Sequence, residues 1–396
     1  MKIGYLVPEF PSQTHAFFWR EARAIEETGT KLQFLSTRRP APDACPHAFR
    51  DEAVARTHYV FPPSGAALRA LAAHPVKAAR ALGYIAGLSE TPAAARLRLA
   101  ALLAAAAELG VVCQREGLEH VHIHSCANAA HLGALLVRLG GPSYSLTLHG
   151  DLPVYGSDHA AKMSAAAFVS AVTRPLAEQV VGVAPGKRAP VIMMGVDCDA
   201  FHPPEPPRTR AADDPLTLLT VARLNKTKGH RHTLEAIAAL VAEGLDLRYR
   251  IVGSGPEEAA IRADIDRLGL ADRVEMLGAL DQVQVYEALL AADVMTLTSF
   301  GQGEAAPVTV MEAMATGLPV VVSRIGGTPD MVEDGVDSYL TPQQDAGAIA
   351  DAIRRLATDP QHARTMGEAA RQKALSAFDF RANAGKLLEE IRATAH

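Results

Sequence analysis

The sequence predicts an α/β protein built from two Rossmann-like domains, and three observations lead to this fold class. The chain has 396 residues. A single hydrophobic core rarely supports a chain of this length, so two domains of about 150–200 residues each are favoured. An apolar segment at 2–7 leads through a loop into a helical pattern at 16–27, and the same order recurs from residue 216. The proline-rich segment 203–207 between them marks a boundary.

The first domain opens with a strand, a loop and a helix. Residues 2–7, which carry no charge after Lys2, are typical of a buried parallel strand, and the helix 16–27 follows them. Further strands are expected at 31–37, 120–124, 143–149, 167–173 and 190–195. Residues 65–110 are rich in alanine and helical in pattern, with breaks at Pro75 and Pro92.

The second domain repeats this plan. Its strands are expected at 216–222, 247–253, 274–278, 294–299, 320–323 and 338–341. A helix at 286–291 precedes the fourth of these strands, and a last helix runs from about residue 378 to 393. We therefore place the two domains at residues 1–200 and 208–378.

The stretch from residue 298 to 334 carries the chemistry of this domain. A strand ends there in a glycine-containing loop, and Pro307 suits the first turn of the following helix, where its missing N–H costs nothing. Glu304 then lies in the loop and Glu312 in the helix, near the carboxyl edge of a parallel sheet, where open α/β folds bind ligands. The amino end of the helix offers N–H donors that suit a phosphate.

Glu304 and Glu312 are spaced as Glu-x7-Glu, between the flanks Glu-Ala-Met-Ala-x-Gly-Leu-Pro-Val and Gly-Gly-x-Pro-Asp-Met-Val-Glu-Asp-Gly. This stretch resembles the donor-site signature of family 4 glycosyltransferases, which are retaining enzymes with the GT-B fold. The alternative to a donor site is that Glu304 and Glu312 are only a solvated glutamate pair beside a buried strand. The resemblance covers essentially the whole chain. It implies two Rossmann-like domains facing across a deep cleft, with the C-terminal helix, 379–396, crossing back to the first domain.

The resemblance also implies roles for single residues. Arg-x4-Lys-Gly after a strand resembles the diphosphate clamp of the family, so Arg223 and Lys228 are expected to hold the diphosphate. Two fixed cations would stabilise the charge of the leaving group more in the transition state than in the ground state. Glu304 would contact sugar hydroxyls, and Glu312 would accept hydrogen bonds from the ribose diol. The remaining donor-binding residues implied are Gly253, Gly278, Ala305, Ala306, Pro307 and Val308.

His149 is the candidate site residue of the first domain. It ends a predicted strand and is followed by Gly150 and Asp151, a placement that suits the interdomain cleft. It also matches the active-site histidine of the family, which contacts the transferred sugar. A histidine that only caps the strand is the alternative. With Arg223, Lys228 and Glu304, His149 completes the predicted catalytic set.

Two loops depart from the common family pattern. The first, residues 8–15, lacks the paired glycines of many members. Its pattern Glu-Phe-Pro-x-x-Thr/Ser-x-x-Phe-x-x-x-Glu instead resembles a subgroup that builds exopolysaccharide, such as colanic-acid-type transferases, and Ser12, Thr14 or His15 could supply the missing acceptor-side contact. The second, Gly303-Glu-Ala-Ala-Pro, places alanines where they would narrow the space near the sugar.

Composition excludes several function classes. A net charge of -5 argues against nucleic acid as a partner. Four scattered cysteines without a CxxC pair suit a reducing cytoplasm. His120, His122 and His124 share one face of a strand, but a row suits tetrahedral zinc poorly, so we expect a cluster at the sheet edge and no metal.

The helical region 65–107 has a basic character that could bring the protein to a membrane. It carries Arg69, Lys77, Arg80, Arg96 and Arg98 against Glu90. A basic amphipathic helical pair can lie on anionic lipid, whereas an ordinary helical layer with a solvated basic face is the alternative. No signal-peptide pattern and no run of about eighteen uninterrupted apolar residues occur, so we expect a cytoplasmic protein, peripheral at most on the inner face of the membrane.

The function implied is transfer of a sugar from a UDP- or GDP-linked donor to an acceptor hydroxyl, with retention of configuration and no cofactor besides the nucleotide sugar. The subgroup implies a polyprenyl-diphosphate-linked oligosaccharide as acceptor, in exopolysaccharide biosynthesis, and a soluble sugar acceptor fits the same donor site. Two other functions stay open: a nucleotide-sugar epimerase or hydrolase, and a non-catalytic GT-B-like subunit that binds a partner enzyme.

Overall fold

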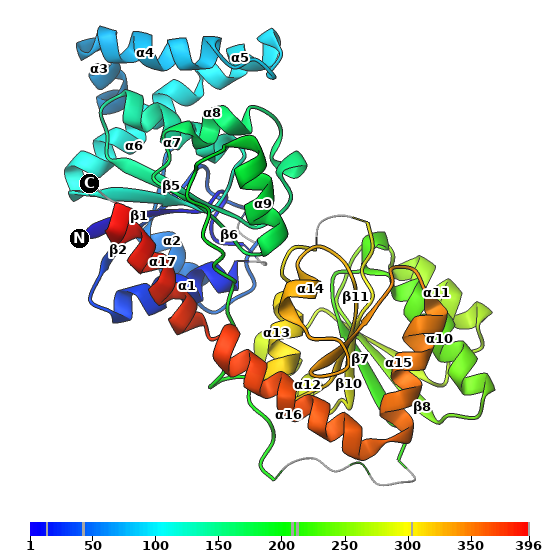
Figure 1. Ribbon diagram of the computed structural model, residues 1–396. Coiled ribbons are helices and arrows are strands. Elements are labelled where there is room, and N and C mark those ends of the chain that lie inside the picture. Colours follow the sequence, from blue (N-terminus) through cyan, green and yellow to red (C-terminus); the bar gives the residue numbers. More distant parts are fainter. Residues whose placement is uncertain (13–14, 42–43, 207–209, 211–213, 302–303, 395–396) are drawn as a thin grey trace. The chain divides into compact units, whose positions relative to one another are not determined.

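The computed structural model describes residues 1–12, 15–41, 44–206, 210, 214–301 and 304–394, and it divides into two units (Figure 1). Unit 1 comprises Met1–Met193 and Phe380–His396, and unit 2 comprises Met194–Asp379. Each unit contains one six-stranded sheet whose paired strands all run parallel. The predicted fold class, two Rossmann-like domains, is therefore confirmed. Residue 208, the expected start of the second domain, lies outside the described residues.

The sheet of unit 1 has the order β3-β2-β1-β4-β5-β6. Its strands are β1 (Lys2–Leu6), β2 (Lys31–Ser36), β3 (Thr57–Tyr59), β4 (His120–Ile123), β5 (Ser143–Leu148) and β6 (Val169–Ala171). Its helices are α1 (Ala16–Glu27), α2 (Arg50–Arg56), α3 (Gly65–Ala73), α4 (Pro75–Ala86), α5 (Ala93–Ala100), α6 (Leu102–Glu116), α7 (Asn128–Arg138), α8 (His159–Ser164), α9 (Arg174–Val183) and α17 (Phe380–Thr394). The strand order reverses between β1 and β4, so the loops that follow these two strands flank the switch point where such sheets bind ligands.

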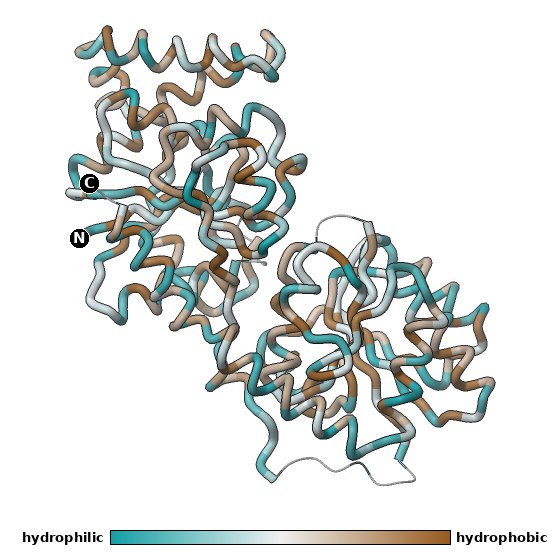
Figure 2. Tube along the Cα trace, viewed as in Figure 1, coloured by the Kyte–Doolittle hydropathy of each residue, from teal (hydrophilic) through white to brown (hydrophobic). Residues whose placement is uncertain are grey.

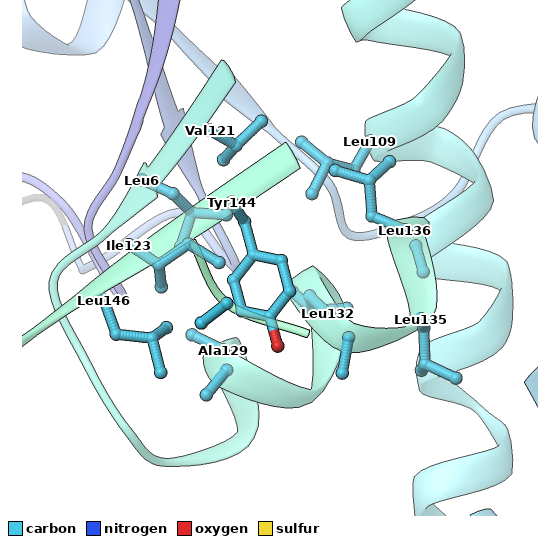
Figure 3. Packing of buried hydrophobic residues seen from close by; sticks show 14 of the residues in the cluster. Leu6, Leu109, Val121, Ile123, Ala129, Leu132, Leu135, Leu136, Tyr144 and Leu146 are labelled. Atoms are coloured by element: carbon cyan, nitrogen blue, oxygen red, sulfur yellow. The ribbon is translucent and has the colours of Figure 1, made fainter. Parts of the chain in front are cut away.

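Both faces of this sheet are covered. On one face, Leu6, Ile123 and Tyr144 from the strands pack against residues of α6 and α7, such as Leu109 and Leu132 (Figure 3). On the other face, a second cluster joins β1 and β2 to α1 and α17. The return of the C-terminal helix to the first domain is thus confirmed by its packing against α1.

The sheet of unit 2 has the order β12-β11-β10-β7-β8-β9. Its strands are β7 (Leu216–Val221), β8 (Leu247–Val252), β9 (Val274–Gly278), β10 (Val294–Leu297), β11 (Val320–Ser323) and β12 (Ser338–Thr341). Its helices are α10 (His230–Ala242), α11 (Glu258–Arg267), α12 (Gln282–Leu290), α13 (Val308–Ala315), α14 (Thr328–Met331), α15 (Ala346–Thr358) and α16 (Pro360–Ala377). The switch point lies between β7 and β10.

Three local expectations needed correction. The segment 190–195 is not a strand in the structure and joins the sheet only through a single bridge from Val191 to Ala171. Helix α12 begins earlier than expected because Asp281 and Gln284 form a reciprocal capping box at its start. The edge strand β3 was missed because three residues are too few to show an alternating pattern.

Residues 93–116, which include α5 and α6, form a helical stretch long and apolar enough to cross a membrane. This stretch is not a run of uninterrupted apolar residues, because it contains Arg96, Arg98 and Glu108, and it was therefore not identified from the sequence. Core helices of water-soluble proteins meet the same test of length and composition. In this protein α6 packs against α3 and α7, so the stretch by itself assigns no membrane span.

Candidate active site

Two predicted site residues of unit 2 meet at the switch point of the sheet. Lys228 lies in the one-turn helix Lys226–Lys228 after β7, and Glu304 lies in the loop after the neighbouring strand β10. The Nζ atom of Lys228 is 2.5 Å from Oε2 of Glu304, and Ser299 Oγ donates to the same oxygen at 2.6 Å. Glu304 is only 8% exposed, so these two donors satisfy a largely desolvated carboxylate.

The backbone around this ion pair depends on two glycines. Gly229, at φ 71°, directly follows Lys228, and a Cβ atom there would lie 2.0 Å from the carbonyl oxygen of Thr298. Gly326, at φ 52°, lies so close to the Glu304 loop that a Cβ atom would lie 1.7 Å from the carbonyl oxygen of Glu304. Only glycine accommodates both this conformation and this approach. The Gly-Gly flank of the Glu-x7-Glu stretch therefore supports the loop that carries Glu304.

The other predicted donor residues lie around the same edge of the sheet. Arg223 follows β7 and is exposed. Gly253 follows β8, and its N–H donates to the carbonyl oxygen of Gly278 at the end of β9, at 2.7 Å. Glu312 lies within α13 and is partly buried.

The turn before α13 offers backbone groups more than side chains. Pro307 caps the helix and Val308 is its first residue. Ala305 accepts a hydrogen bond from the N–H of Gly327 at 2.8 Å, and Ala306 is 4% exposed. The first N–H groups of α13 have no partner within the helix, which suits an anion at this position.

Sequence reasoning missed two residues of this site. Ser299 was predicted only as the end of a strand, yet it donates to Glu304. His230, the residue after the Lys-Gly pair, is 4% exposed. Burial lowers the pKa of His230 to about 4, so its ring is neutral at physiological pH. The sequence signal for His230 was its position directly after Lys228 and Gly229.

In unit 1, His149 follows β5 and is packed among aromatic rings. The rings of Phe17 and Phe18 lie 5.4 and 5.1 Å from its own. Its Nε2 atom is 3.2 Å from Nδ1 of His124, and its Nδ1 atom has no hydrogen-bond partner within the described ranges of the chain. Burial, with a smaller contribution from the charge of His15, lowers the pKa of His149 to about 3. The ring is therefore a neutral hydrogen-bonding group at physiological pH.

The acceptor-side loop is described in part. Ser12 is partly buried, and Thr14 lies outside the described residues. His15 precedes α1, and its ring stacks on Phe10 at 6.1 Å and meets Phe18 edge-on at 5.2 Å. Burial lowers the pKa of His15 to about 4.

Two of the three histidines in the predicted row, His120 and His122, lie within the sheet and not at its edge, which corrects our expectation for them. His124 follows the carboxyl end of β4 and contacts His149. His120 pairs with Ser143 and Ser145, and His122 pairs with Ser145 and Thr147, all at 2.7–2.8 Å. Both rings are completely buried beside β5. Within the described ranges, no group of three histidine, cysteine or acidic side chains is arranged to hold a metal ion.

A cavity of about 450 Å³ in unit 2 lies apart from these residues. Its lining includes Leu216, Val294 and Pro319, which stand at the amino ends of β7, β10 and β11. Ligands of open α/β sheets bind at the opposite, carboxyl ends of the strands. This cavity is therefore not a candidate for the site.

Residues 203–373 match the family described as Glycosyl transferases group 1. The chain is 39% identical over 182 residues to WcaL of Escherichia coli (strain K12), which is named as a candidate colanic acid biosynthesis glycosyltransferase, and the match covers 44% of each protein. It is 34% identical over 200 residues to the amylovoran biosynthesis glycosyltransferase AmsK of Erwinia amylovora, covering 49% of this chain and 48% of AmsK. The matched regions thus span less than half the length of these relatives.

The fold extends the similarity to the whole chain. The structure of HepE from Anabaena in complex with UDP covers 99% of this chain and 100% of HepE, with a TM-score of 0.74 at 18% identity. HepE has also been solved with UDP-glucose. At this identity the likeness concerns the fold, and it confirms the GT-B fold class that the sequence predicted.

Proposed function

Because this chain belongs to the family of group 1 glycosyl transferases, we propose that it transfers a sugar from a nucleoside-diphosphate sugar to an acceptor hydroxyl. The configuration at the anomeric carbon is retained in this proposal. The observation that carries it is the pairing of Lys228 with Glu304 beside the amino end of α13. A cation, a carboxylate and free helix N–H groups at one switch point suit a ligand that joins a diphosphate to a sugar.

In this proposal, the residues of unit 2 stabilise the leaving diphosphate. Lys228 exchanges its bond to Glu304 for a phosphate oxygen, and Arg223 adds a planar guanidinium that binds oxygens in pairs. These cations oppose the charge that grows as the sugar–phosphate bond breaks. Glu304, released from Lys228, then accepts hydrogen bonds from sugar hydroxyls, and Glu312 binds the ribose diol. In unit 1, His149 is the proposed contact for the transferred sugar.

The names of two relatives support a place in exopolysaccharide biosynthesis. WcaL is named for colanic acid and AmsK for amylovoran. We propose a polyprenyl-diphosphate-linked oligosaccharide as the acceptor for this chain. Such an acceptor would place the protein at the inner face of the membrane.

The donor proposal is tested by the thermal stability of the protein with UDP, GDP and ADP, each with and without EDTA. One diphosphate at about one hundred times its dissociation constant adds about 2.7 kcal/mol, which corresponds to roughly 5–10 °C in Tm for a domain of this size. EDTA should leave the shift intact because Arg223 and Lys228 supply the positive charge. Arg223→Ala should abolish most of the shift.

Arg248→Ala is the matched control, because Arg248 is likewise exposed and lies on the adjacent strand β8. It should keep the full shift. A protein that no diphosphate stabilises contradicts the transferase proposal, and a shift that EDTA abolishes contradicts the proposal that no metal is required.

Membrane association is a separate proposal, and it is supported by the surface of α3, α4 and α5. Figure 2 shows hydrophobic and hydrophilic residues interspersed along these helices. Four large apolar side chains are exposed among the basic residues: Leu68 by 54%, Val76 by 65%, Leu82 by 46% and Leu97 by 77%. Apolar side chains with neighbouring lysines and arginines bind interfaces that carry anionic lipid.

Co-sedimentation with vesicles tests this association. We expect binding to vesicles that contain phosphatidylglycerol, none to pure phosphatidylcholine, and release at high salt, because each basic residue adds about 1 kcal/mol near an anionic surface. Val76→Asp should weaken binding at least tenfold. Val283→Asp is the control, because Val283 is also 65% exposed but lies in unit 2. Equal binding of both variants and the wild type contradicts the proposal.

A further inference from the structure

A chain of polar side chains in unit 1 leads from β1 to His149. The hydroxyl of Tyr5 donates to Oε1 of Glu21 at 2.7 Å. The same oxygen lies 3.3 Å from Nε2 of His124, within ion-pair distance although not aligned as a hydrogen bond. Nδ1 of His124 lies 3.2 Å from Nε2 of His149. Four residues, on β1, on α1 and directly after β4 and β5, thus form one connected series.

Aromatic packing holds the rings of this series in place. Phe18 and Glu21 are three residues apart on α1 and therefore share one face of the helix. The ring of Phe18 meets His124 at 4.8 Å and His149 at 5.1 Å, edge to face in both contacts. The side chain of His124 is completely buried. The rings have little freedom to exchange partners. The neighbouring group therefore determines which ring nitrogen of each histidine carries the hydrogen.

The proton positions follow from the chemistry of the first member. An ionised carboxylate can only accept, so it favours a hydrogen on Nε2 of His124. Burial holds the pKa of His124 well below its usual value, so the ring is neutral and its Nδ1 carries a lone pair. That lone pair accepts from Nε2–H of His149. The second nitrogen of His149, Nδ1, then carries a lone pair, and it has no hydrogen-bond partner among the residues that the structure describes.

We propose that Glu21 and His124 are positioning residues, which hold His149 as the Nε2–H tautomer and leave its Nδ1 atom as an acceptor for a substrate hydroxyl. This inference rests on the proposed function, in which His149 contacts the transferred sugar. It also gives a role to Glu21, the last residue of the Glu-Phe-Pro pattern near the amino terminus. Neither Glu21 nor His124 touches the substrate in this proposal.

The tautomer of His149 can be measured without any substrate. Nitrogen-15 NMR of ring-labelled histidine distinguishes a protonated from an unprotonated ring nitrogen, and the signals of His149 are assigned by their loss in His149→Asn. Burial raises the pKa of Glu21 to about 7, against the smaller opposing effect of the Tyr5 hydroxyl, so spectra are recorded at about pH 8.5, where the carboxylate is ionised. We expect protonated Nε2 and unprotonated Nδ1 for His149 in the wild type.

The variants separate positioning from folding. Glu21→Leu and His124→Phe each remove an acceptor and keep an apolar side chain in place, and both should give mixed His149 tautomers. Glu21→Gln and His124→Asn keep an acceptor oxygen and should restore the wild-type signals. Glu27→Leu, at an exposed glutamate of the same helix, is the matched control and should change nothing. A wild type with its proton on Nδ1, or unchanged His149 signals in both Glu21→Leu and His124→Phe, overturns the inference.

A kinetic cycle extends the test to the reaction. With the nucleotide sugar selected by the thermal-shift measurements, Glu21→Leu should lower kcat by about tenfold, the size of a typical coupling between groups in contact. The same change should have no further effect in a His149→Ala background. If the tautomers behave as expected but the cycle is additive, positioning by Glu21 does not serve the reaction. If no transfer occurs with any donor while the NMR result holds, the proposed function fails and the tautomer assignment stands.

Discussion

Acidification is expected to unfold unit 1 before unit 2. In the described part of unit 1, burial is the main cause of a lowered pKa at seven histidines, and the shift is large at six of them: His15, His120, His122, His124, His131 and His149. The pKa of the seventh, His159, is shifted less. The pKa of His120 falls to about 4 and that of His149 to about 3. In unit 2, burial lowers the pKa of His230 to about 4. The described part of unit 1 therefore resists protonation at many more positions.

The sign of the effect follows from the two states. An unfolded histidine binds a proton near pH 6.5. The folded histidines bind one only at a distinctly lower pH, and the pKa of His15, His120 and His131 is about 4. The stability that they contribute is complete above pH 6.5 and is lost as the pH falls toward the folded pKa values. Glu21 acts in the opposite sense, because its pKa is raised to about 7 in the folded state. The proton that Glu21 binds in the folded state offsets one of the six protons that these histidines bind only in the unfolded state.

The magnitude is large because the protons are taken up together. Each proton that the unfolded state binds in excess lowers the free energy of unfolding by about 1.4 kcal/mol per pH unit. A net excess of about five protons corresponds to roughly 7 kcal/mol per pH unit near pH 5. The whole stability of a domain is about 5–15 kcal/mol. We therefore expect unit 1 to unfold between about pH 6 and pH 4.

The single tryptophan makes the measurement specific to unit 1. Trp19 lies on α1, and its ring stacks on Phe34 at 5.4 Å and on Phe49 at 5.1 Å. Its fluorescence should change at a higher pH than the helical circular dichroism signal, to which both units contribute. Coincident transitions of the two signals would contradict separate acid unfolding of the units.

Two variants at single histidines provide the control. His120→Asn removes one buried imidazole, so the transition should become less steep by about one proton. His74→Asn changes an exposed histidine of the same unit and should leave the steepness unaltered. The steepness is the relevant quantity, because His120→Asn also removes hydrogen bonds to Ser143 and Ser145 and lowers stability at every pH.

Replacing Lys228 and replacing Glu304 should both impair transfer while changing diphosphate binding in opposite directions. Lys228→Met removes a cation directed at the developing charge, so kcat/KM should fall by about 10²–10³-fold, and the diphosphate should bind more weakly. Glu304→Gln removes the carboxylate that holds Lys228 at 2.5 Å. It should free this cation for the diphosphate, whose affinity should rise, while loss of the sugar contact lowers kcat/KM.

Calorimetric titration with the diphosphate and steady-state kinetics with its sugar conjugate give the two quantities. Lys226→Met is the matched control, because Lys226 is an exposed lysine in the same helical turn. It should retain both binding and transfer. The role assigned to the ion pair would be wrong if Glu304→Gln weakened diphosphate binding as much as Lys228→Met does.

The order of strands and helices along this chain could be predicted from the sequence, because its signals are local. The apolar run of β1 and the helical pattern of α1 were predicted within a residue of their observed ends. Pro307 marked the start of α13, because its ring suits the first turn of a helix and not its interior. The Glu-x7-Glu stretch is likewise a local signal, because its residues lie close together in the sequence, and it indicated the family.

The contacts between distant residues were decided only by the tertiary structure. Lys228 and Glu304 are 76 residues apart in sequence, and they meet because β7 and β10 are neighbours in the sheet. Glu21, His124 and His149 meet because β4 lies between β1 and β5 in the sheet, and because α1 packs Phe18 against both histidine rings. Which strands become neighbours depends on how the whole sheet buries its two faces. No short segment contains that information, so the sequence named the individual residues and the packing of the sheet decided which of them act together.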